Sequence, residues 1–118
     1  MTQKTILIVD DQDDTRSTLR TILEKEKYTV VEAVNGDDCL AKLKKVKPDL
    51  ILLDIMMPGT QVIDVVRQIS GIKIVYVSAV RATDEEKKQI FRDSHVVAFI
   101  EKPFNIKELI TCVKKLTQ

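Results

Sequence analysis

Four apolar runs in this chain each end in a polar residue that could take part in metal or phosphoryl chemistry. The runs at 6–9, 50–53, 72–77 and 96–100 are followed by Asp10 and Asp11, by Asp54, by Ser78 and, one residue further on, by Lys102. If the runs are neighbouring parallel strands, their carboxyl ends share one edge of a sheet. Three carboxylates, a hydroxyl and an ammonium then meet in one crevice, which suits a divalent cation and a phosphoryl group.

The charges of this crevice call for a cation. Asp10, Asp11 and Asp54 carry three negative charges, and Lys102 returns one positive charge. Like charges held this close disfavour ionisation strongly, and a divalent cation would cancel the two that remain. Carboxylate oxygens with no nearby histidine or cysteine select a hard ion, so we predict Mg²⁺.

Each acidic residue has an expected role at the metal. We expect Asp11 and Asp54 to bind Mg²⁺ directly and Asp10 to bind it through a water molecule. The backbone carbonyl of Met56 is a further expected ligand. Asp54 stands alone at the end of its run, so its carboxylate can also act as a nucleophile and form an acyl phosphate.

Two further groups complete the expected chemistry. Lys102 would pair with one phosphoryl oxygen, and the Ser78 hydroxyl would donate to another. Little more is required, because phosphoryl transfer depends mainly on positioning and electrostatics.

Alternating strands and helices must position these groups. The expected strands cover 5–10, 29–34, 49–54, 72–78 and 96–100. Four of the five are continuous apolar runs, which is typical of strands buried on both faces of a parallel sheet. Helical patterns follow the strands, with apolar residues at Leu19 and Leu23, Cys39 and Leu43, Val62 and Val66, within 83–92, and at Leu109 and Val113. We predict a doubly wound α/β fold, (βα)₅ and flavodoxin-like, with a five-stranded parallel sheet and five helices.

Local signals mark several helix starts. The segment 35–37 opens the second helix, and Asn105 stands near the start of the fifth. Thr83 and Glu86 offer a capping box for the fourth helix. Asp13 and Asp14 stand near the N-cap of the first helix, where acids favour the helix dipole.

Composition and charge exclude several classes of function. The chain has 118 residues, with 44% apolar and 31% charged residues and a net charge of +1, so we expect one domain over 1–118, with no output domain. The interleaved charges give no basic patch for nucleic acid, and no run is long enough to cross a membrane. Cys39 and Cys112 lack metal or redox spacing, which indicates reduced thiols in the cytoplasm.

Four motifs, in order, resemble one known family over the whole length of the chain. They are 8–11 (Ile-Val-Asp-Asp), 48–59 (Pro-Asp-Leu-Ile-Leu-Leu-Asp-Ile-Met-Met-Pro-Gly), 78–79 (Ser-Ala) and 102–104 (Lys-Pro-Phe). The chain is similar to the receiver domains of two-component response regulators, the CheY-like family. This resemblance implies Mg²⁺-dependent transfer to Asp54 from the phosphohistidine of a sensor histidine kinase or a histidine phosphotransfer protein. It also allows a cis bond between Lys102 and Pro103.

The resemblance also implies a signalling switch. Ser78 would move toward the phosphoryl group while Phe99, on the fifth strand, turns inward. Phe99 has no hydroxyl, so its part in the switch would rest on packing alone. The fourth helix, fifth strand and fifth helix would form a face for docking or for a homodimer. The sequence does not identify the downstream effector.

Several positions depart from the family pattern. Val62 replaces the usual glycine at the start of the third helix, and 95–98 reads His-Val-Val-Ala in place of a Gly-Ala-acidic stretch. Both changes affect local loop geometry rather than the phosphorylation chemistry. Met56 and Val80, near the site, are apolar and poorly suited to orient an attacking water, so we predict slow loss of the phosphoryl group.

Two other functions fit parts of the sequence. The residue types at 11–15 fit the nucleophile motif of haloacid-dehalogenase-type phosphatases. In that family, however, the nucleophile directly follows the strand, whereas Asp11 follows Asp10. That family also needs an acidic pair after its lysine, and Glu108 is the only acid in the sixteen residues beyond Lys102. The second alternative is a receiver-like scaffold that binds partners without phosphorylation, against which the full set of acids, hydroxyl and lysine argues.

Overall fold

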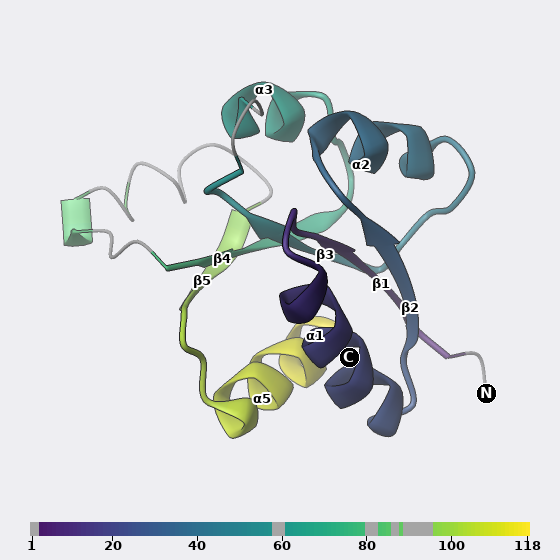
Figure 1. Ribbon diagram of the computed structural model, residues 1–118, viewed down its shortest axis with the longest axis vertical. Helices are drawn as coiled ribbons and strands as arrows, with labels where there is room; N and C mark the ends of the chain where they lie inside the picture. The colour runs from purple at the N-terminus through teal and green to yellow at the C-terminus, as the bar shows by residue number, and fades with distance from the viewer. Residues whose placement is uncertain (1–2, 58–60, 80–82, 86–87, 89–95) are drawn as a thin grey trace.

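Strands and helices alternate along the chain in a computed structural model, which describes residues 3–57, 61–79, 83–85, 88 and 96–118 (Figure 1). The strands are β1 (Thr5–Val9), β2 (Thr29–Ala33), β3 (Leu50–Asp54), β4 (Lys73–Ser78) and β5 (Val96–Glu101). The helices are α1 (Asp13–Lys25), α2 (Gly36–Leu43), α3 (Val62–Arg67) and α5 (Ile106–Leu116).

The five strands form one parallel sheet in the order β2-β1-β3-β4-β5. Figure 1 shows α2 and α3 on one face of the sheet and α1 and α5 on the other. The strand order reverses between β1 and β3, so the crevice at their carboxyl ends is the expected binding site of a doubly wound sheet. This confirms the predicted fold class.

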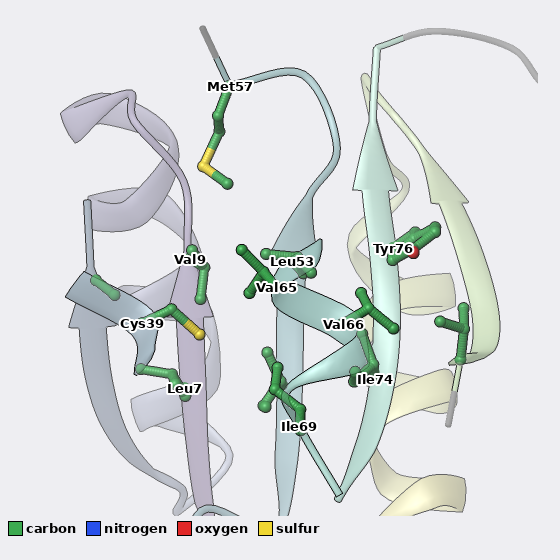
Figure 2. Packing of buried hydrophobic residues seen from close by; sticks show 13 residues of the cluster. Leu7, Val9, Cys39, Leu53, Met57, Val65, Val66, Ile69, Ile74 and Tyr76 are labelled. Atoms are coloured by element: carbon green, nitrogen blue, oxygen red, sulfur yellow. The ribbon is translucent and has the colours of Figure 1, made fainter. Parts of the chain in front are cut away.

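Side chains of the central strands are buried alternately on the two faces. Leu7, Val9, Ile51 and Leu53 pack against Cys39, Val65, Val66 and Ile69 of the helices α2 and α3 and the turn after them (Figure 2). Ile6, Ile8, Leu50 and Leu52 pack against Leu19, Leu23, Leu109 and Val113 of α1 and α5. Burial on both faces explains why these strands are continuously apolar.

The element boundaries differ from the predictions by one residue at strand ends and by more in the helices. The second helix ends at Leu43, although the pattern suggested that it continued toward Pro48. Asn35 caps α2 by accepting from Asp38 N over 2.8 Å, and Asn105 caps α5 by accepting from Lys107 N over 2.8 Å. Despite Val62 in place of glycine, α3 begins at that residue.

The predicted fourth helix, 83–92, and its capping box with Glu86 lie largely outside the described residues. Within that range, Asp84, Glu85 and Lys88 are helical. In the 95–98 stretch that departs from the family pattern, the pairing of β4 and β5 shifts register after Val96, because Ile74 pairs with Val96 and Val75 with Ala98. In the described part of the chain, no helix has the length and apolar character needed to cross a membrane.

Candidate functional site

The sheet register places Asp10 and Asp54 side by side. Val9 pairs with Leu53, so the two aspartates that follow them emerge from adjacent strands. Asp10 is 2% exposed and Asp54 is 4% exposed, whereas the neighbouring Asp11 is exposed. One carboxylate oxygen from each of these three residues lies within 4.8 Å of the others. The three predicted acids therefore form one cluster.

Backbone N–H groups orient the two buried carboxylates. The Gln12 N–H donates to Asp10 Oδ1 over 2.9 Å, and the Met56 N–H donates to Asp54 Oδ1 over 2.9 Å. In both residues the second oxygen, Oδ2, faces Lys102. The carboxylates are thus turned toward a common centre.

Lys102 reaches this centre from the segment after β5, which is an edge strand of the sheet. Its Nζ lies 2.8 Å from Asp10 Oδ2 and 3.4 Å from Asp54 Oδ2. The Lys102 N–H donates to the carbonyl of Ser78 over 2.7 Å, which ties the segment after β5 to the end of β4. The bond between Lys102 and Pro103 is cis, as the resemblance allows.

Burial and charge act together on the ionisation of the site. Burial raises the pKa of the Asp54 carboxyl; the Met56 N–H and Lys102 oppose this rise, and the charge of Asp10 adds to it. Burial alone would lower the pKa of Lys102, but the hydrogen bond to Asp10 and the charges of both aspartates raise it overall. With three carboxylates in the cluster and one lysine beside them, ionised acids would leave the pocket with excess negative charge.

The donor set fits a hard divalent cation. It consists of carboxylate oxygens, and neither histidine nor cysteine belongs to the cluster that the described residues form. Oxygen donors of this kind suit Mg²⁺. The division into direct and water-mediated ligands, and the Met56 carbonyl, stay predictions.

Of the other two predicted site residues, Ser78 lies at the carboxyl end of β4 and Phe99 lies on β5. Ser78 is fully buried and stands one residue beyond Val77, which pairs with Asp54. Phe99 is half-buried against the core on the α2 and α3 face. Its ring meets that of Tyr76 edge to face, with centroids 6.5 Å apart. The structure thus brings Ser78 to the edge of the site, and its role and that of Phe99 stay predictions.

The sequence reasoning missed Arg16. This residue is buried on α1, 7% exposed, and its Nη1 donates to the backbone carbonyl of Asp10 over 2.6 Å. A signal was available, because Arg16, Leu19 and Leu23 stand at i, i+3 and i+7 and share the buried face of the helix. An arginine in register with core leucines indicates a buried partner.

Comparison with known proteins assigns this arrangement to a family. Residues 6–114 match the family described as the response regulator receiver domain. The chain belongs to this family. Receiver domains generally bind Mg²⁺ in an acidic pocket, and response regulators take phosphoryl groups from histidine kinases. This chain has a cluster of three aspartates at the carboxyl ends of its strands. As a receiver domain the chain is a signalling domain, and the phosphatase and scaffold alternatives are not favoured.

Relatives of this receiver domain include a protein about twice its length and a protein of similar length. It is 42% identical over 112 residues to the transcriptional regulatory protein ResD of Bacillus subtilis, covering 94% of this chain and 47% of ResD. It is 34% identical over 121 residues to the sporulation initiation phosphotransferase F of Bacillus subtilis, covering 98% of this chain and 94% of that protein. The chain therefore spans about half the length of ResD and nearly all of the second relative.

Solved structures agree with the assignment. The CheY-like receiver domain protein of Methanospirillum hungatei is 30% identical and superimposes with a TM-score of 0.85, covering 98% of this chain and 94% of that one.

Proposed function

We propose that this receiver domain, 1–118, accepts a phosphoryl group on Asp54 from the phosphohistidine of a sensor histidine kinase or a histidine phosphotransfer protein. The observation that carries the proposal is the difference between the contacts that Lys102 makes to the Oδ2 atoms of Asp10 and Asp54. Asp10 Oδ2 is held by Lys102 over 2.8 Å, whereas Asp54 Oδ2 makes a longer contact of 3.4 Å. Asp54 thus combines a buried, oriented carboxylate with the less engaged oxygen, which favours it as the nucleophile.

The transfer exchanges one bond to phosphorus for another. Asp54 Oδ2 attacks the phosphorus, the new O–P bond forms, and the electron pair of the P–N bond returns to the donor imidazole. The Met56 N–H keeps the carboxylate aimed during this step. Lys102 and the Ser78 hydroxyl then pair with phosphoryl oxygens.

The acidic residues supply the place for a cation during this transfer. Asp10, Asp11, Asp54 and the Met56 carbonyl would hold Mg²⁺, which offsets charge on the phosphoryl oxygens when bound. Without a cation, repulsion between the cluster and a phosphoryl dianion would oppose the approach of the donor.

The donor has room to approach beside Lys102. A hollow of about 290 Å³ opens there, lined by Asp14, Thr15, Thr18, Lys102, Pro103 and Phe104. It lies between the start of α1 and the segment after β5, and Lys102, whose ammonium would meet the phosphoryl group, is one of its lining residues. This space supports the docking of a partner that presents a phosphohistidine.

The output of the domain is proposed to be a change of surface. Ser78 would shift toward the phosphoryl group and Phe99 would pack further inward, altering the face formed by the fourth helix, β5 and α5. Val97 on β5 and Ile106 at the start of α5 expose 42% and 54% of their surface, which supports docking of an effector or a second copy near these two elements. Cys39 and Cys112 are free thiols packed on opposite faces of the sheet, which fits the cytoplasm.

Beryllofluoride, a phosphoryl mimic, tests the site directly. We expect it to bind Asp54 in the presence of Mg²⁺, with the largest NMR shifts at the ends of β1, β3 and β4. Binding at Asp11 would instead support a phosphatase of the haloacid-dehalogenase type. Absence of binding would support a scaffold that works without phosphorylation.

The residue two positions after Asp54 is expected to control how long the phosphoryl group persists. Met56 exposes 56% of its surface beside the site and its thioether is a poor partner for an attacking water. We expect Met56→Asn to shorten the half-life of the phosphoprotein about tenfold, because an amide can orient water. The decay of purified phosphoprotein measures this. A half-life of seconds in the wild type would contradict the proposed slow decay.

A further inference from the structure

Arg16 joins three segments around the acidic cluster. Its Nη1 donates to the backbone carbonyl of Asp10, its Nε donates to Glu32 Oε1 over 3.1 Å, and its Nη2 donates to Asp13. Asp10 follows β1, Glu32 lies on the edge strand β2, and Asp13 begins α1. One guanidinium therefore ties the end of β1 to the first turn of α1 and to β2.

The bond to Asp10 restrains the peptide that links two candidate ligands. The Asp10 carbonyl and the Asp11 nitrogen belong to one planar peptide group, so a donor fixed on this oxygen at 2.6 Å limits rotation of that plane. The Gln12 N–H donates to Oδ1 of the Asp10 carboxylate. The direction of both carboxylates then depends on a turn that Arg16 anchors.

The network around Arg16 is electrically balanced. Arg20, one turn further along α1, donates from Nη1 to Glu32 Oε2 over 2.8 Å, so two guanidinium groups face the carboxylates of Glu32 and Asp13. The charge of Arg16 is thus largely offset outside the cluster. Its effect on a bound cation would come from geometry rather than from repulsion.

We propose that Arg16 is a positioning residue for the metal site, acting through the backbone of Asp10 to aim Asp10 and Asp11. This inference rests on the proposed metal site and deepens it. Among the hydrogen bonds and ion pairs of the described residues, none joins Arg16 to a carboxylate of the cluster. Partners that orient metal ligands from outside commonly change metal affinity by about 10- to 100-fold when removed.

Arg20 provides a matched control. It shares the helix, the residue type and the Glu32 contact with Arg16, but its Nη2 donates to the carbonyl of Val30 over 2.8 Å instead of to Asp10. Removing either arginine weakens the connection of α1 to β2. Only the removal of Arg16 releases the Asp10 carbonyl.

Calorimetric titration of Mg²⁺ into wild type, Arg16→Gln and Arg20→Gln tests the proposal. We expect Arg16→Gln to raise the Kd for Mg²⁺ about tenfold or more, with Arg20→Gln within about twofold of wild type. Urea unfolding in EDTA gives the stability of each variant separately. An unchanged Kd in Arg16→Gln, or an equal rise in both variants, overturns the positioning role.

A conservative variant covers the case in which Arg16→Gln does not fold. Arg16→Lys keeps the charge but loses the planar fork that serves three acceptors at once. We expect its Kd to lie above that of the wild type, and a folded Arg16→Lys with the wild-type Kd overturns the proposal. Wild type that binds no Mg²⁺ overturns the metal site itself, whereas wild-type binding with no effect at Arg16 refutes this inference alone.

Discussion

Asp54→Asn will gain no phosphoryl group when it is incubated with Mg²⁺ and acetyl phosphate, whereas the wild type will gain one. The amide keeps the shape of the side chain and can still accept from the Met56 N–H, but it is not a nucleophile toward phosphorus. Intact-protein mass spectrometry measures the result. Because the carboxylate is the acceptor itself, we expect complete loss rather than a reduced rate.

The control for this result is Asp64→Asn, which changes an exposed carboxylate on α3 by the same atoms. It is expected to gain the phosphoryl group as the wild type does. An equal gain in Asp54→Asn would mean that another residue accepts the group, and a wild type without any gain would refute the phosphoacceptor function.

The same substitution has an expected effect on stability that depends on pH. Since burial raises the pKa of Asp54 from 3.8, the folded protein binds this proton more tightly than the unfolded chain does. Stability of the wild type in EDTA therefore falls as pH rises from 3.8 through the raised pKa. We expect Asp54→Asn to be more stable than the wild type at pH 7, because the amide avoids the cost of a buried charge.

The pH series separates this charge effect from other consequences of the substitution. Below the unfolded pKa, Asp54 is protonated in both states, so the stabilising effect should disappear there. Urea unfolding of both proteins at several pH values measures the difference. A difference that is the same at every pH would exclude the charge of Asp54 as its cause.

Lys102→Met is expected to lower the free energy of unfolding in EDTA by about 3 kcal/mol, because it removes the ammonium group that pairs with two buried carboxylates. Asp10 and Asp54 are almost fully buried, and Lys102 makes an ion pair with each of them. Added Mg²⁺ should recover much of this loss by supplying positive charge to the same cluster of carboxylates. Urea unfolding with and without Mg²⁺ measures both effects.

Two variants show whether the loss comes from unpaired charge. Lys115→Met, on an exposed position of α5, should change stability by at most about 0.5 kcal/mol. Adding Asp10→Asn to Lys102→Met should restore stability, because it removes one of the carboxylates left unpaired. If Lys102→Met behaves like Lys115→Met, the lysine does not neutralise the cluster.

The fold class followed from the sequence because its signal is local and repeated. Runs such as 50–53 are apolar at every position, and short runs of this kind are typical of a strand covered on both faces. Once the strands are parallel, their carboxyl ends must share an edge, so the meeting of Asp10, Asp54 and Lys102 followed from the positions of single residues. Helix boundaries were less accurate, since α2 ends at Leu43 although the apolar pattern continues to Val46, and helix ends are poorly defined by the pattern alone.

Other features required the tertiary structure. The sequence by itself determined which residues reach the crevice: the acids after β1 and β3, Ser78 after β4 and Lys102 after β5. Only the structure decided which oxygen of each carboxylate faces Lys102, which lies 92 residues from Asp10 and 48 from Asp54, and that Arg16 donates to the Asp10 carbonyl. The physical reason is the separation along the chain of the residues that interact. Strand identity is written in neighbouring residues, whereas hydrogen bonds of a few ångströms join atoms far apart in the chain, and their geometry exists only after the sheet and helices have packed.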